Sequence, residues 1–238
     1  MQAYIGTSGW SYRHWQGRFY PAGLPTSQWL AFYGRHFTTV EINASFYRLP
    51  TQDRFAAWAA AVPPDFRFAV KASRFITHQK KLGEPEHTLP PLLEAVTGLG
   101  ERLGPVLFQL PPRFAPHPGR LARLLQLLPR HWQVAFEFRD PRWHCPPVLD
   151  LLAAHNAAWC IYDLAGYTAP RTLTADFTYL RLHGPTAAYR GRYGKARLAP
   201  WAEWLRQAPV TRAYVYFDND EAAHAVADAL TLRELLAA

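Results

Sequence analysis

The chain has 238 residues, of which 49% are hydrophobic, 15% aromatic and 18% charged, a composition that excludes a disordered chain. Its length suits one large globular domain with a substantial core. The formal net charge of +8 favours anionic partners such as nucleic acid or phosphorylated small molecules, although an arginine-rich genome would give the same charge.

Short apolar or alternating segments recur along the chain and predict eight β-strands. They cover residues 3–8, 38–43, 66–72, 105–110, 132–138, 158–163, 178–183 and 213–218. Apolar spacing of three and four residues predicts helices over 52–62, 90–103, 119–128, 146–155, 199–207 and 220–236. The segment 164–176 is short and rich in turn-forming residues, so we expect an irregular or missing sixth helix.

Strands that alternate with helices indicate βαβ units and a parallel sheet. Eight such units without a linker favour a closed barrel over an open sheet. The predicted fold class is therefore α/β, a single (β/α)8 barrel of the TIM type in which residues 1–238 form one domain.

Polar side chains share one face of the predicted strands; in 132–138, for example, Glu137 alternates with Phe136 and Phe138. The apolar face suits the surrounding helices, so the polar face is expected to point into the barrel. These polar residues lie at or near the C-terminal strand ends, where barrels of this type carry their active sites. The expected set on this rim is Glu41, Lys71, Gln109, Glu137, Arg139, Asp163, Arg181, His183 and Asp218.

A salt-bridged plug that only stabilises the barrel is the alternative interpretation of this rim. Desolvation offsets most of the Coulomb gain when so many charges are buried, which favours a functional site. The candidate catalytic residues are Glu41, Lys71, Glu137, Asp163, His183 and Asp218.

Loops beside the strand ends supply further candidates. Segment 184–195 interleaves Gly, Arg and Tyr, residue types that allow close approach, phosphate binding and stacking, although a mobile surface loop is the alternative. The candidate substrate-binding residues are Trp10, Tyr12, Asn43, Tyr47, His78, Gln109, Arg139, Trp143, Arg181, Tyr189, Arg192, Tyr193 and Asn219.

Common cofactor and metal motifs are missing from the sequence: it has no GxxxxGK[ST], no GxGxxG after a strand, no HExxH and no GxSxG. We therefore expect no cofactor. A divalent metal among the carboxylates and His183 is a minor alternative, because Lys71, Arg139 and Arg181 compete for the same carboxylates.

Cellular location is suggested by the cysteines and by hydropathy. Cys145 and Cys160 form no CxxC pair, which favours reduced thiols over a disulfide framework. No apolar run is long enough to span a membrane, and the first residues do not resemble a signal peptide. We expect a cytoplasmic protein with no membrane association and no obligate protein partner.

Seven motifs, spread over nearly the whole chain, resemble those of one protein family. They are GTSGWSY (6–12), TVEINASFYRLP (39–50), FAVKASRFITH (68–78), GPVLFQLPPRF (104–114), AFEFRDPRW (135–143), YLRLHGP (179–185) and YVYFDND (214–220). Together they resemble the YecE-like family, domain of unknown function seventy-two. The resemblance implies a TIM-barrel fold and no known reaction. The family has been likened to endonuclease IV, but this sequence lacks the His-rich metal set of that enzyme.

Our leading hypothesis is an enzyme, a hydrolase or lyase, that acts on an anionic, phosphate-bearing substrate, nucleic acid included. Arg139, Arg181 and the loop 189–195 would hold the phosphate, and Glu137 or Glu41 would be the general acid or base. Lys71 would stabilise charge or form a Schiff base. The alternatives are a non-catalytic nucleic-acid-binding barrel and a metal- or Schiff-base-dependent isomerase or lyase of a small sugar or acid.

Overall fold

The computed structural model describes residues 1–237, so Ala238, the last residue of the predicted domain, lies outside the described residues. One sheet contains all nine strands. These are β1 (Gln2–Thr7), β2 (Thr39–Ile42), β3 (Arg67–Lys71), β4 (Leu103–Leu110), β5 (Val134–Phe138), β6 (Ala158–Leu164), β7 (Tyr167–Thr168), β8 (Phe177–Leu182) and β9 (Arg212–Phe217).

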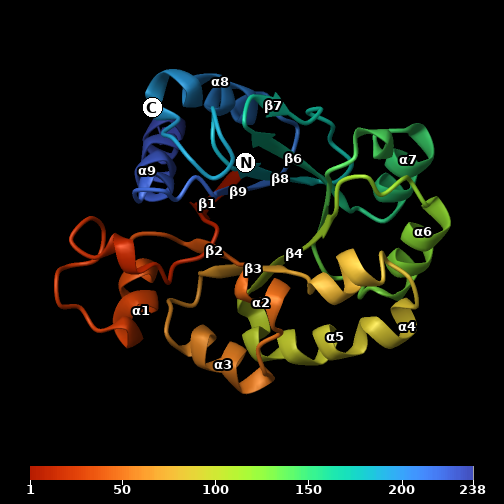
Figure 1. Ribbon diagram of the computed structural model, residues 1–238, viewed down its shortest axis with the longest axis horizontal. Helices are drawn as coiled ribbons and strands as arrows, with labels where there is room; N and C mark the ends of the chain where they lie inside the picture. Colours follow the sequence, from red (N-terminus) through yellow and green to blue (C-terminus); the bar gives the residue numbers. More distant parts are fainter. Residues whose placement is uncertain (238) are drawn as a thin grey trace.

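The strands pair in the order β1-β9-β8-β6-β5-β4-β3-β2, and all these pairings are parallel. Only β7 departs from this path, as an antiparallel hairpin on β6. Helices surround the strands (Figure 1). This arrangement confirms the predicted α/β barrel.

The barrel closes between β1 and β2 through a side chain as well as through the backbone. The Tyr33 hydroxyl accepts a hydrogen bond from the Thr7 N–H at 3.0 Å and donates to the Thr39 carbonyl at 3.1 Å. The two strands come so close here that a Cβ on Gly6 would lie 2.2 Å from the Thr39 oxygen. Glycine at this position therefore permits the closure.

The helices are α1 (Trp29–Gly34), α2 (Ala44–Tyr47), α3 (Gln52–Ala60), α4 (Pro85–Thr88), α5 (Pro90–Val96), α6 (Pro118–Leu127), α7 (Pro146–Ala154), α8 (Gly194–Gln207) and α9 (His224–Ala237). Proline begins α4, α5, α6 and α7, where its missing N–H costs no helical hydrogen bond. Of the described residues, 165–176 contain no helix, as expected.

Three predicted helices differ from those observed by more than two residues. The segment 90–103 is α5 followed by a 3₁₀ segment, Thr97–Arg102, which is kinked at Gly100, where the backbone is non-helical with φ of 52°. Helix α8 begins at Gly194, five residues before the predicted start at 199, and α9 begins at His224, four residues after the predicted start at 220. No helix formed by residues 1–237 is both long and apolar enough to cross a membrane.

Strand alternation separates two apolar clusters. The larger cluster lies between the strands and the helices and includes Phe68, Phe108 and Phe136. The smaller fills the barrel interior with alternate residues of the same strands: Tyr4, Ala69, Leu107, Ala135, Ala158, Cys160, Phe177, Tyr179, Tyr214 and Tyr216. The predicted division into helix-facing and inward-facing residues is thus confirmed for the apolar positions, and the charged inward residues lie beyond this filling.

Candidate functional site

Arg181 on β8 occupies the centre of a buried ion network. Its Nε and Nη2 atoms donate to the two oxygens of Glu41 at 2.9 and 2.7 Å, and its Nη1 donates to Glu137 Oε2 at 2.7 Å. The Arg181 side chain is 1% exposed, and both glutamates are fully buried. Because Glu41 lies on β2 and Glu137 on β5, one guanidinium joins three strands across the barrel.

Further hydrogen bonds occupy the carboxylate oxygens of the two glutamates. Ser8 Oγ donates to Glu41 Oε1, Tyr179 OH donates to Oε2 at 2.7 Å, and Arg139 Nε donates to Glu137 Oε1. Burial alone would raise the pKa of Glu137, but the guanidiniums of Arg139 and Arg181 hold it well below its usual range. Both carboxylates therefore serve as fixed counter-ions of the guanidiniums.

His183 connects this network to Asp218. Its Nδ1 lies 3.0 Å from Asp218 Oδ2, and its Nε2 lies 2.9 Å from Arg139 Nη2. A guanidinium is only a hydrogen-bond donor, so His183 Nε2 accepts from Arg139. His183 Nδ1 then carries the hydrogen that it donates to Asp218 in a hydrogen bond. The Arg139 guanidinium lies over the Tyr162 ring at 4.7 Å, and Tyr189 packs edge-on against His183 at 5.6 Å.

Lys71, the last residue of β3, is the exception in this cluster. It is 9% exposed and, within residues 1–237, its side chain forms no hydrogen bond and no ion pair, although its backbone carbonyl accepts from Ser45 Oγ at 2.6 Å. Its Nζ lies 4.3 Å from the Phe46 ring centroid. Burial, reinforced by the positive charge of Arg181, lowers the pKa of Lys71 to about 8. Lys71 is thus a buried amine that no fixed partner holds.

Two other predicted residues lie near Lys71. His78 packs edge-on against Phe46 at 5.0 Å, and burial together with the charge of Lys71 lowers its pKa. Gln109 is half-buried and pairs in register with Glu137 on the neighbouring strand. The structure therefore brings cationic and neutral polar groups together beside the ion network, at the mouth of the barrel.

A groove of about 720 Å³ adjoins the network and is lined by three predicted residues, Trp10, Tyr12 and Asn43, together with Trp58. Asn43 Nδ2 donates to Ser8 Oγ at 2.5 Å, whereas Asn43 Oδ1 is buried without a hydrogen-bond partner in the described part of the chain. Asn43 thus connects the groove to the Ser8 and Glu41 contacts of the network.

Asp163 does not belong to the network, and its predicted inward direction is wrong. On β6 the inward residues are Cys160 and Tyr162, and Asp163 has the opposite parity. Its carboxylate instead accepts from Tyr193 OH at 2.6 Å and from Thr168 Oγ1 at 2.7 Å. The strand parity therefore places Tyr162, not Asp163, beside Arg139.

Tyr193 and Asn219 are likewise anchors of the loop rather than exposed binding groups. Asp228 on α9 is fully buried and accepts from Tyr193 N at 2.8 Å, Gly194 N at 3.0 Å and Asn219 Nδ2 at 2.8 Å. Arg192 is mostly exposed, with its Nε 3.7 Å from Asp228. These contacts hold the start of α8 against α9, outside the barrel interior.

Trp143 lies outside the mouth, whereas Tyr47 packs edge-on against Phe46, the neighbour of Lys71, at 5.1 Å. Trp143 is fully buried, stacks on Phe138 at 4.6 Å and donates from Nε1 to the Phe114 carbonyl at 2.5 Å, so it is a core residue. Tyr47 is 74% exposed at the end of α2.

Sequence reasoning missed five residues of these clusters: Ser8, Phe46, Tyr162, Tyr179 and Asp228. Strand parity was the available signal for Tyr162 and Tyr179, because both alternate with apolar residues on their strands. No group of three or more His, Cys, Asp and Glu side chains within residues 1–237 has an arrangement suited to a metal ion.

Two known bacterial proteins resemble the chain, one over nearly its whole length and one over part of it. The protein YunF of Bacillus subtilis strain 168 is 25% identical over 98% of this chain and 94% of YunF. The protein YecE of Escherichia coli K12 is 31% identical, over 59% of this chain and 49% of YecE.

Solved structures agree with the fold. A DUF72 family protein from Thermotoga maritima MSB8 has a TM-score of 0.80 at 26% identity, with 100% of both chains covered. One from Enterococcus faecalis V583 has a TM-score of 0.78 at 22% identity, covering 100% of this chain and 98% of that one. The family model described as "Protein of unknown function DUF72" matches residues 4–238, and the chain therefore belongs to the DUF72 family.

Proposed function

We propose that the protein is an enzyme that acts on a small anionic, phosphate-bearing molecule at the C-terminal mouth of the barrel. The observation that carries this proposal is Lys71, a buried cation without a fixed partner beside a network whose glutamates are already bound. A substrate oxyanion would give Lys71 the ion-pair partner that the described part of the protein does not provide.

The ion network would position the residues that meet the substrate. Glu41 and Glu137 have their oxygens bound to guanidiniums and hydroxyls, so we assign them as counter-ions and not as the general acid or base. The Arg181 guanidinium is likewise occupied by its hydrogen bonds to these carboxylates. The Arg139 side chain is 11% exposed, so part of it meets the mouth and would share the anion with Lys71.

Lys71 would also transfer a proton. With a pKa of about 8, roughly a tenth of its amine is unprotonated at pH 7, so both protonation states are accessible. The groove lined by Trp10, Tyr12 and Asn43 would take the rest of the substrate.

A Schiff-base lyase is the second candidate, favoured by the same amine. Unprotonated Lys71 would add to a substrate carbonyl, and the carbonyl oxygen would leave as water to give the imine. Borohydride would reduce this imine to a stable secondary amine. Mass spectrometry after incubation with borohydride and a phosphorylated ketone such as dihydroxyacetone phosphate would then show a covalent adduct on Lys71.

Calorimetric titration with inorganic phosphate and pyrophosphate tests the main proposal. The proteins are wild type, Lys71→Met, Lys71→Arg and, as a matched loss of charge, Arg197→Met, because Arg197 is exposed on α8 and lies outside the loop 189–195. We expect Lys71→Met to weaken binding at least about tenfold, or ~1.4 kcal/mol, and Arg197→Met to leave it unchanged. Lys71→Arg keeps the charge and should retain binding.

Turnover is measured on a phosphomonoester, a phosphodiester and a single-stranded oligonucleotide. Hydrolysis of one of these by the wild type and by Arg197→Met, and its loss in Lys71→Met, supports the proposal of an enzyme. The proposal fails if Lys71→Met binds phosphate as tightly as the wild type does. Oligonucleotide binding that falls steeply with salt and ignores Lys71 would favour the nucleic-acid-binding alternative instead.

A further inference from the structure

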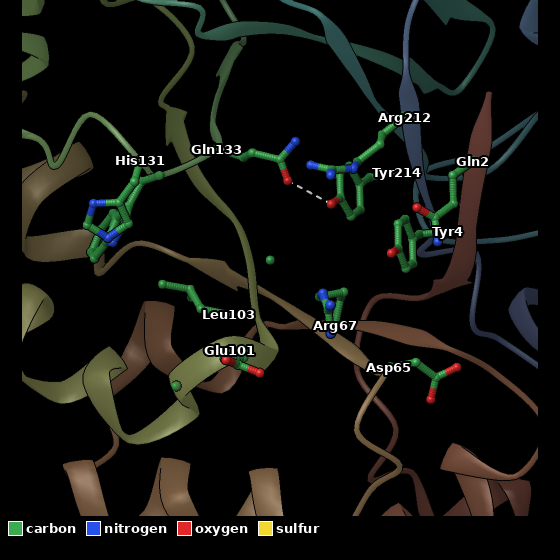
Figure 2. Close-up of a pocket in the computed structure, with 13 residues that line it drawn as sticks. Gln2, Tyr4, Asp65, Arg67, Glu101, Leu103, His131, Gln133, Arg212 and Tyr214 are labelled. Carbon is green, nitrogen blue, oxygen red and sulfur yellow. Dashed lines mark hydrogen bonds between the residues drawn. The ribbon is translucent and has the colours of Figure 1, made fainter.

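A second cavity, of about 520 Å³, lies at the opposite end of the barrel from the ion network. Its lining comes from the first residues of strands, including Gln2 of β1, Arg67 of β3, Leu103 of β4 and Arg212 of β9. Figure 2 shows these side chains around the opening. A volume of this size accommodates a small metabolite.

The inner wall of the cavity is rigid. Tyr4 and Tyr214 stack with ring centroids 4.9 Å apart and an interplanar angle of 7°. The Tyr214 hydroxyl donates to Gln133 Oε1 at 2.7 Å, the dashed line in Figure 2. Burial raises the pKa of Tyr214 to about 12, so this hydroxyl keeps its proton. Since Oε1 of Gln133 is occupied, its Nε2 is the amide atom left to donate.

Two guanidiniums add further donors. Arg67 Nη1 donates to the carbonyls of Pro64 at 3.2 Å and Phe66 at 3.0 Å, which fixes the guanidinium and leaves Nε and Nη2 unused. The Arg212 backbone pairs with β1 and β8, but its guanidinium forms no hydrogen bond or ion pair with any residue in 1–237. The positive charges of both arginines act on Tyr214, so both lie near the same wall.

Two acidic residues, Asp65 and Glu101, line the same cavity, but within the described chain neither forms an ion pair with Arg67 or Arg212. The unpaired polar groups near Tyr214 include three donors: two guanidiniums and one amide. Donors of this kind bind oxyanions, and arginine suits them through its planar pair of N–H groups.

We propose that this cavity binds a small oxyanion, a phosphate ester or a polycarboxylate, at a site separate from the C-terminal mouth. The tyrosine pair gives the ligand an apolar wall, and Arg67, Arg212 and Gln133 hold its charged group. The site does not depend on the proposed reaction at Lys71, because the two ends of the barrel share none of these residues.

The test is calorimetric titration with pyrophosphate and, separately, citrate, in a Lys71→Met background that removes the mouth as an anion site. In that background we compare Arg212→Gln, Gln133→Glu and the control Arg18→Gln, a charge loss at an exposed position. Gln133→Glu keeps an acceptor for Tyr214 and places a negative charge in the cavity. We expect Arg212→Gln and Gln133→Glu to weaken binding about tenfold or more, and Arg18→Gln to have no effect.

The two probes decide the ligand class, since tighter binding of pyrophosphate indicates phosphate and tighter binding of citrate indicates carboxylate. Thermal unfolding of each variant verifies that it is folded at the titration temperature. The inference is overturned if Lys71→Met alone binds neither probe, or if both cavity variants bind as Arg18→Gln does. A loss of binding between the wild type and Lys71→Met concerns only the anion site at the mouth. The proposed function and the proposed second anion site can therefore fail independently of each other.

Discussion

Arg181 holds Glu41 through two hydrogen bonds, from Nε to Oε2 at 2.9 Å and from Nη2 to Oε1 at 2.7 Å. The pair lies in the closed interior, with the Arg181 side chain 1% exposed and Glu41 fully buried. Two-point pairing fixes the guanidinium plane and thereby the direction in which its third nitrogen, Nη1, meets Glu137. The geometry of the whole mouth therefore depends on this pair.

Removing Arg181 while keeping Glu41 should destabilise the fold strongly. Arg181→Met leaves Glu41 and Glu137 as buried charges that have lost their main partner, so we expect the free energy of unfolding to fall by about 3–5 kcal/mol. Urea denaturation followed by circular dichroism measures the change. The control is Glu203→Gln, which removes the exposed pair with Arg206 and should cost at most about 1 kcal/mol. Equal effects of the two variants would contradict a stabilising role for the network.

Glu137 should make stability depend on pH in the acid range. Its pKa in the folded protein is well below the ordinary value of 4.5, so between these two values the unfolded chain binds a proton that the folded protein does not. The resulting stability is complete above the unfolded pKa and is lost as pH falls through the folded one. Urea denaturation at several pH values from about 5 to 2 should show a shallower slope for Glu137→Gln than for the wild type.

A comparison of wild type with Glu94→Gln supplies the control for this pH dependence. Glu94 is exposed on α5 and forms no ion pair within residues 1–237, so this variant should keep the slope of the wild type. The same slope in Glu137→Gln would show that Glu137 does not contribute in this range.

The closure of the barrel should depend on Gly6. Alanine there would bring its Cβ to 2.2 Å from the Thr39 oxygen, so β1 and β2 would have to separate, and we expect Gly6→Ala to lower the free energy of unfolding by at least about 2 kcal/mol. Gly119→Ala is the matched control, because nothing lies within 4 Å of its Cβ and it stands in α6. It should be neutral or stabilising by up to about 1 kcal/mol, as measured by denaturant unfolding.

The fold was predictable because its main signals are local. Apolar alternation marks each strand, and the inward and outward sets follow from a period of two that holds through Phe136, Glu137 and Phe138. The same rule, applied through β6, places Tyr162 inward and Asp163 outward. The error at Asp163 came from weighting its charge above its parity.

The pairing inside the mouth was not predictable in the same way. The sequence identifies Glu41, Glu137 and Lys71 as inward residues. It does not show that both glutamates pair with guanidiniums or that the Lys71 amine has no ion-pair partner among the described residues. That outcome depends on distances across the barrel between Arg181 and glutamates that lie 140 and 44 positions away in the chain. Asp228 is missed for a related reason, since its helix α9 contacts the start of α8 only in the folded chain.

Lys71 should titrate at a lower pH than an ordinary lysine, and this can be tested without knowing a substrate. Burial and the charge of Arg181 lower its pKa to about 8, whereas an unperturbed lysine has a pKa of about 10.4. Competitive labelling with an amine-selective reagent, followed by mass spectrometry of the peptides, gives the labelling rate of each lysine against pH. We expect the Lys71 rate to reach half its maximum near pH 8. Exposed Lys195 serves as the internal reference for the reagent. Arg181→Lys keeps a positive charge near Lys71 and should change its midpoint little, provided that circular dichroism shows the variant folded. A Lys71 midpoint at the ordinary lysine value of about 10.4 would remove the basis for assigning proton transfer or imine formation to this amine.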